Sequence, residues 1–162
     1  MIEQVTIQEI LPAHTTAMAN LIRSIFEELE IPKVGTAYED PSLNDLYKAY
    51  QAPRSSYFVA LKGEKVVGGV GLAPLANYSG SMGELQKLYV DRKVRSQGVG
   101  AQLVERCLQQ AKSFKYAGCY LETMPNMKAA QKLYQRYGFN FCEEPLGETG
   151  HSACHVYMLT KF

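Results

Sequence analysis

The stretch Arg95-Ser96-Gln97-Gly98-Val99-Gly100 lies between an apolar segment, Leu88-Tyr89-Val90, and a segment whose apolar residues repeat at helical spacing. Glycines let a backbone approach a ligand closely, and the free N–H groups at the start of a helix attract negative charge. Lys87, Arg92 and Lys93 add positive charge nearby. The stretch therefore predicts an anion-binding turn between a strand and a helix, and the alternative is a tight structural turn with a solvated basic rim.

The elements around this turn follow from the spacing of apolar residues and from the positions of proline and glycine. Three strands in succession precede the turn, which excludes a simple doubly wound alternation of strands and helices. We expect one mixed α/β domain over residues 1–162. Its order is a strand near 5–10, a helix ending before Pro32, a short helix over 43–50, strands over 57–61, 66–72 and 84–90, a helix from about 98, a strand over 119–122, a helix from 125–126 to 137, and strands near 139–144 and 154–159.

The composition describes a globular chain of 162 residues with a net charge of +1 and 46% apolar residues. The near-neutral charge argues against a general nucleic-acid binder, although the first fifty residues are acidic and the remainder is basic. The chain contains no apolar run long enough for a membrane helix, and its N-terminus lacks the pattern of a signal peptide. We expect a cytoplasmic protein without a membrane partner, and we expect its four cysteines to form no disulfides.

Two motifs in order resemble the GCN5-related N-acetyltransferase (GNAT) family. The first is Leu88-Tyr89-Val90 followed by Arg95-x-x-Gly98-x-Gly100, and the second is Asn126-x-x-Ala129-x-x-x-Leu133-Tyr134-x-x-x-Gly138-Phe139. The glycine turn is neither a P-loop nor a dinucleotide fingerprint, which makes ATP a weaker expectation. The resemblance implies a mixed central sheet of about seven strands with about four helices. It also implies that two central parallel strands, 84–90 and 119–123, splay apart around the cofactor.

The resemblance implies acetyl-CoA as co-substrate. The main-chain amides of residues 96–100 would hold the CoA pyrophosphate, and the main chain of residues 88–90 would pair with the pantetheine arm. Asn126 would contact that arm, and the alternative is an ordinary N-cap that commits its side chain to the helix. The expected cofactor-binding residues are Leu88, Tyr89, Val90, Arg95, Ser96, Gln97, Gly98, Val99, Gly100 and Asn126.

Three residues are candidates for the chemistry. By resemblance, Tyr134 would face the thioester sulfur and donate a proton to the departing thiolate, and the alternative is a core aromatic with its hydroxyl at the surface. Glu84 would accept the proton that the attacking amine loses, if burial raises its pKa, and the alternatives are an exposed strand-end glutamate or a water chain. His151, in an expected loop, is a second candidate base, and the alternative is a surface histidine. His155 and Cys154 provide no established metal spacing with His151, so we expect no metal.

The acceptor remains the open half of the reaction. The first helical region and its loop, which wall the acceptor pocket in this family, carry acidic residues that would attract a cationic amine: Glu27, Glu28, Glu30, Glu39 and Asp40. We expect direct acetyl transfer to a primary amine of a small molecule. The alternatives are a protein or peptide acceptor, or a noncatalytic acyl-CoA-binding regulatory protein, which would need neither Tyr134 nor Glu84. The resemblance also makes a homodimer reasonable.

Overall fold

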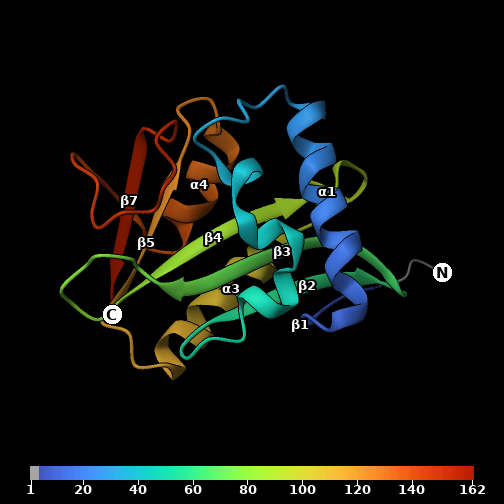
Figure 1. The fold of residues 1–162 in the computed structure, drawn as a ribbon, viewed down its shortest axis with the longest axis horizontal. Helices are drawn as coiled ribbons and strands as arrows, with labels where there is room; N and C mark the ends of the chain where they lie inside the picture. Colours follow the sequence, from blue (N-terminus) through green and yellow to red (C-terminus); the bar gives the residue numbers. More distant parts are fainter. Residues whose placement is uncertain (1–3) are drawn as a thin grey trace.

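The computed structural model describes residues 4–162, and its elements follow the expected order (Figure 1). Seven strands form one mixed sheet in the order β1-β2-β3-β4-β5-β7-β6. The strands are β1 (Val5–Glu9), β2 (Ser56–Lys62), β3 (Lys65–Pro74), β4 (Met82–Val90), β5 (Gly118–Thr123), β6 (Asn140–Cys142) and β7 (Val156–Lys161). The α-helices are α1 (Thr15–Glu28), α2 (Leu46–Ala49), α3 (Val99–Ser113) and α4 (Lys128–Arg136). The predicted α/β fold is confirmed.

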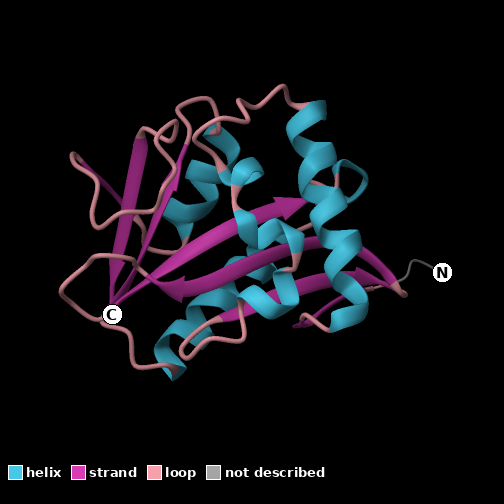
Figure 2. Ribbon diagram, in the orientation of Figure 1, coloured by secondary structure: helices cyan, strands magenta, loops and turns pink. Residues whose placement is uncertain are grey.

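Helices cover both faces of the sheet (Figure 2). Alternate residues of β2 belong to different cores: Phe58 and Ala60 pack with α3, whereas Tyr57 and Val59 pack with α1. This separation follows from the two-residue period of a strand, and both sets are buried because each face is covered. The α1–α2 layer and the α3–α4 layer therefore each pack a separate hydrophobic core against one face of the sheet. Within residues 4–162, no helix is both long and apolar enough to cross a bilayer.

The central strands β4 and β5 are the parallel pair, and they separate after three residue pairs. The pairing runs from Met82 opposite Gly118 to Glu84 opposite Tyr120, while β4 continues to Val90. Beyond Glu84 the facing backbone groups of the two strands lack each other as partners, and such groups need another partner, such as a ligand. The predicted splay is therefore present, and Glu84 stands at its apex.

A β-bulge in β4 changes which side chains reach the α1–α2 layer. Gly71 pairs with Gln86 but Gly69 pairs with Tyr89, so β4 holds one extra residue, and Lys87 adopts a left-handed φ of 50°. The Tyr57 hydroxyl donates to the Lys87 carbonyl oxygen over 2.9 Å. The bulge breaks the usual alternation of side chains. The consecutive side chains of Gln86 and Lys87 consequently both contact Tyr50, which follows α2.

Several boundaries differ from those expected by one to three residues. The last helix begins at Lys128 rather than at 125–126, because Pro125 and Asn126 form a turn in which the Met127 N–H donates to the Met124 carbonyl oxygen over 3.0 Å. The last strand extends to Lys161, since its pairing with β5 continues to the residue opposite Gly118. These shifts leave the order of elements unchanged.

Candidate active site

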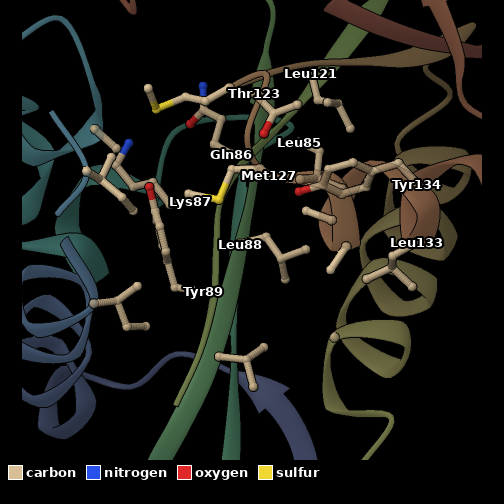
Figure 3. Close-up of a pocket in the computed structure, with 18 of the residues that line it drawn as sticks. Leu85, Gln86, Lys87, Leu88, Tyr89, Leu121, Thr123, Met127, Leu133 and Tyr134 are labelled. Carbon is tan, nitrogen blue, oxygen red and sulfur yellow. The ribbon is translucent and has the colours of Figure 1, made fainter. Parts of the chain in front are cut away.

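A cavity of about 570 Å³ lies where β4 and β5 diverge (Figure 3). Its walls come from α1, β4, the turn before α3, β5, α4 and the loop between β6 and β7. The structure places most of the predicted site residues on this one cavity: Glu84, Leu88, Tyr89, Val90, Arg95, Ser96, Gly98, Val99, Gly100, Tyr134 and His151. Gln97 and Asn126 are exposed and lie outside its lining, and the cap position of α4 is occupied by Met127.

The turn before α3 presents its backbone to the cavity. Ser96 and Gly98 both have positive φ angles, of 66° and 82°. Gly98 is the N-cap of α3 and no side chain caps the helix there, so the first N–H groups of α3 have no intrahelical acceptor. A Cβ atom added to Gly98 would meet nothing within 4 Å. This open, positively polarised end of the helix can accept an anionic group.

The Arg95 side chain is held by other parts of the protein. Its guanidinium binds both carboxylate oxygens of Glu28 on α1, over 2.7 and 3.1 Å, and its Nε donates to the Val90 carbonyl oxygen over 3.0 Å. The bidentate pair fixes the orientation of the guanidinium plane. Arg95 therefore fastens the glycine turn to α1 and to the end of β4.

Most of the acidic cluster that we expected to attract a cationic amine is engaged in contacts within the chain. Glu28 binds Arg95, Glu27 pairs with Lys33, and a Glu39 carboxylate oxygen accepts from the Gly35 N–H. Asp40 contacts two basic side chains, described below. These contacts neutralise much of the negative charge that the sequence places along this region.

Tyr134 is part of the core, with its hydroxyl directed toward the cavity. Its ring packs against Phe139 with centroids 5.8 Å apart, and only 6% of the residue is exposed. Figure 3 shows the hydroxyl pointing from α4 toward the gap beside β4. Burial raises the pKa of the hydroxyl well above its usual value. The group consequently keeps its proton at neutral pH and can donate a hydrogen bond into the cavity.

Glu84 is buried, so its interpretation as an exposed strand-end residue is wrong. The residue is 4% exposed, because both faces of the sheet are covered at the point where the strands part. Burial raises the pKa of its carboxyl to about 7, against the opposing effect of a hydrogen bond from Gln86. Gln86 Nε2 donates to Glu84 Oε1 over 2.5 Å. A carboxyl with this pKa is partly ionised near neutral pH, as a general base requires.

His151 is also largely buried, so its interpretation as a surface histidine is wrong. Its Nε2 lies 2.9 Å from Asp40 Oδ2, and its side chain is 12% exposed. Lys87 Nζ lies 2.7 Å from the same Asp40 oxygen. Burial would raise the pKa of Asp40, but the contacts with His151 and Lys87 outweigh it and lower that pKa. Lys87, Asp40 and His151 form a network that joins β4 to two loops far apart in the sequence.

Sequence reasoning missed Lys87 and Gln86 as parts of the site. A lysine in a strand is normally placed on a solvated face, and only the bulge buries it. The available signal was the run of glycines in β3: a Cβ on Gly71 would lie 2.8 Å from the Tyr50 ring, so this position admits the aromatic side chain beside the bulge.

Metal ligation has no support in the part of the chain that the structure describes. Among residues 4–162, no three His, Cys, Asp or Glu side chains are grouped so that they can hold a metal ion. Cys107, Cys119, Cys142 and Cys154 are free thiols.

Comparisons with known sequences agree on one family. Residues 17–139 match the sequence model of the acetyltransferase (GNAT) family. A protein of Escherichia coli K12 named uncharacterized N-acetyltransferase YjgM is 36% identical over 146 residues, covering 90% of this chain and 87% of that protein. Human N-acetyltransferase 8 is 38% identical over 114 residues, covering 66% of this chain and 50% of the human protein. The chain thus matches only half of the human relative's length.

Solved structures share the fold. An acetyltransferase of the GNAT family from Staphylococcus aureus Mu50 superimposes with a TM-score of 0.85 at 21% identity, covering 98% of this chain and 99% of that one. The PaiA N-acetyltransferase of Thermoplasma acidophilum, solved in complex with coenzyme A, has a TM-score of 0.72 at 15% identity, covering 98% and 99%. With the cavity at the splayed strands and the open start of α3, these matches show that the chain belongs to the GNAT family of acetyl-CoA-dependent N-acetyltransferases.

Proposed function

We propose that this enzyme moves an acetyl group from acetyl-CoA directly to a primary amine of a small molecule. One observation carries the proposal. Two groups placed for opposite proton transfers line the same cavity: Glu84, a buried carboxyl with a pKa of about 7, and Tyr134, whose hydroxyl points toward the gap beside β4. Glu84 is linked through Gln86 to Tyr50 in the α1–α2 layer, whereas Tyr134 belongs to the α3–α4 layer. A donor and an acceptor substrate can therefore meet between them.

The cofactor half of the cavity suits CoA. The open start of α3 would receive the pyrophosphate, with Ser96, Gln97, Val99 and Gly100 around Gly98. The main chain of residues 88–90 lies beyond the last pair between β4 and β5 and would bond to the pantetheine arm. Asn126, exposed before α4 and outside the cavity lining, would reach the same arm from beside α4.

The reaction then needs no acyl-enzyme. The amine nitrogen attacks the acetyl carbonyl carbon, a C–N bond forms and the C–S bond breaks. Glu84 takes the proton that the amine loses, directly or through water, and Tyr134 gives its proton to the CoA thiolate. Cysteine is a poor nucleophile in this cavity, because burial raises the pKa of Cys154, a residue in the cavity wall, to about 11.

Two contacts between loops support a small acceptor. The Ala153 N–H donates to the Gly35 carbonyl oxygen over 3.0 Å, and His151 pairs with Asp40. Both contacts join the loop before β7 to the segment between α1 and α2, beside the Glu84 side of the cavity. An extended peptide would have to displace these contacts, whereas a small amine fits the cavity without doing so.

The test combines a substrate screen with one isosteric variant. We expect acetylation of members of a small-amine panel assayed beside peptide libraries, with kcat/KM rising through an apparent pKa near 7. Glu84→Gln keeps the shape and loses the base, and we expect kcat/KM to fall by about 10²-fold or more with unchanged acetyl-CoA affinity. Activity confined to peptides would contradict the small-molecule acceptor, and an unimpaired Glu84→Gln enzyme would contradict the role of Glu84.

A further inference from the structure

Hydrogen bonds connect Lys87 to Glu84 through two neutral side chains. Lys87 Nζ donates to the Tyr50 hydroxyl oxygen over 3.5 Å, and the Tyr50 hydroxyl donates to Gln86 Oε1 over 2.6 Å. Gln86 Nε2 then donates to Glu84 Oε1 over 2.5 Å. Every bond has its donor on the Lys87 side and its acceptor on the Glu84 side.

We infer that Tyr50 and Gln86 are positioning residues, which form with Lys87 a directed hydrogen-bond chain that orients the Glu84 carboxylate and stabilises its ionised form. This inference rests on the proposed role of Glu84 as the base. It assigns a task to Tyr50, Gln86 and Lys87 that does not require any of them to touch substrate.

The two ends of the chain fix its direction. An ammonium group can only donate, and an ionised carboxylate can only accept. A hydroxyl and an amide do both, so Tyr50 and Gln86 take the polarity that the ends impose. Hydrogen bonds in such a sequence polarise one another, and their effect is larger in a buried site than in water. The chain therefore opposes the burial that disfavours the Glu84 charge.

The donor end of the chain is held in place. The Lys87 side chain is 4% exposed and pairs with Asp40, which also contacts His151. The bulge in β4 turns Lys87 toward this layer, and Gly71 leaves space for the Tyr50 ring. The bulge, the ion pair with Asp40 and the hydrogen bond to Tyr50 therefore hold the Lys87 ammonium group in place.

Other charged groups also act on Glu84. His151 and Lys87 favour its ionised form, and Glu122 on β5 disfavours it. Glu122 accepts hydrogen bonds from the hydroxyls of Tyr120 and Thr149 over 2.6 and 2.5 Å. Neither hydroxyl takes part in the hydrogen-bond chain from Lys87 to Glu84. A substitution at Tyr50 therefore leaves these contacts in place and isolates the effect of that hydrogen-bond chain on Glu84.

The decisive variant is Tyr50→Phe, which removes one oxygen and keeps the ring that packs against Tyr57 at a centroid distance of 5.1 Å. Without the Tyr50 donor, the Gln86 amide loses its imposed orientation, and we expect the pKa of Glu84 to rise by roughly half a unit or more. Gln86→Leu removes the direct donor, and we expect a larger rise. Tyr47→Phe removes a hydroxyl from α2, the helix directly before Tyr50 in the structure, outside the hydrogen-bond chain, and is the matched control.

The measurement is an NMR titration of the full chain carrying glutamate isotopically labelled at the side-chain carboxyl carbon, with the Glu84 signal assigned by its loss in Glu84→Gln. Circular dichroism checks the fold of each variant. A Glu84 pKa that rises in Tyr50→Phe and in Gln86→Leu, but not in Tyr47→Phe, supports the chain. A Glu84 pKa in folded Tyr50→Phe equal to that of the unsubstituted protein overturns it.

The pH profile of kcat/KM separates this inference from the proposed function. If the Glu84 pKa measured by NMR rises and the acidic limb of the kcat/KM profile shifts with it, the hydrogen-bond chain and the role of Glu84 as the base are both supported. If the Glu84 pKa measured by NMR rises while the kcat/KM profile is unchanged, the hydrogen-bond chain is supported but Glu84 is not the base.

Discussion

Lys87 illustrates how one backbone angle can decide the chemistry of a site. Its left-handed φ marks the bulge, and its side chain is buried against Asp40 rather than solvated. A lysine seldom adopts this conformation, since only glycine does so without steric cost. The Tyr57 hydroxyl bonded to the Lys87 carbonyl oxygen and the ion pair with Asp40 both help to hold it there. The strained residue directly follows Gln86, the donor to Glu84, and backbone strain commonly accompanies function.

Tyr134→Phe tests the proton donor at the residue scale. The change removes the hydroxyl and leaves the ring packed against Phe139, so the fold and acetyl-CoA binding should be preserved. Without the donor the thiolate must leave unprotonated, and we expect kcat at saturating substrates to fall by about 10²-fold. Tyr137→Phe, at the end of the same helix but outside the cavity lining, is the control. A Tyr134→Phe enzyme with unchanged kcat would show that another group, or water, protonates the thiolate.

The start of α3 is the element on which cofactor binding depends, and Gly98 can be probed with two substitutions. Gly98→Ala adds a methyl group in open space but at a φ of 82°, so we expect a loss of about 1–2 kcal/mol in stability. Gly98→Glu adds the same backbone strain together with a carboxylate beside the expected pyrophosphate. Titration calorimetry should show acetyl-CoA binding to Gly98→Glu at least about tenfold weaker than to Gly98→Ala. Equal affinities would mean that no anion is bound at this turn.

The elements were largely predictable from sequence, whereas the contacts within the site were not. Period-two and helical spacing, with glycine and proline at the boundaries, predicted all seven strands and four α-helices in order. The bulge at Lys87 depends on the Tyr57 hydroxyl from β2 and on the Tyr50 ring from the end of α2, and no local pattern encodes those contacts. The Arg95–Glu28 pair joins residues 67 positions apart, and the burial of Glu84 results from helices on both faces. Such features arise from tertiary packing, which single-residue propensities do not describe.

At the scale of the whole molecule, the site combines segments from both layers at one defect in the sheet. β4 contributes Glu84 and the chain that reaches Tyr50, α4 contributes Tyr134, and the turn before α3 contributes its free N–H groups. The splay that opens the cavity also removes sheet hydrogen bonds, and the buried ionisable groups add a cost of desolvation. The arrangement therefore lowers the free energy of unfolding. The contribution of Glu84 to that free energy can be measured through its dependence on pH.

Glu84→Gln should make the protein more stable, and the gain should depend on pH. The folded-state pKa of Glu84 is about 7 against an ordinary value of 4.5, so between these values the unfolded chain releases a proton that the folded chain retains. Folded stability consequently falls as pH rises through this window and levels off above it. Glutamine stays neutral and shows no such loss, so the gap between the two proteins should grow from pH 4.5 to pH 7, by up to about 3 kcal/mol. Urea unfolding of both proteins across this range measures the gap, because most other titrating groups are shared and cancel. A gap that stays constant with pH would mean that Glu84 titrates near its ordinary value, and the carboxyl would then be too weak a base for the reaction proposed above.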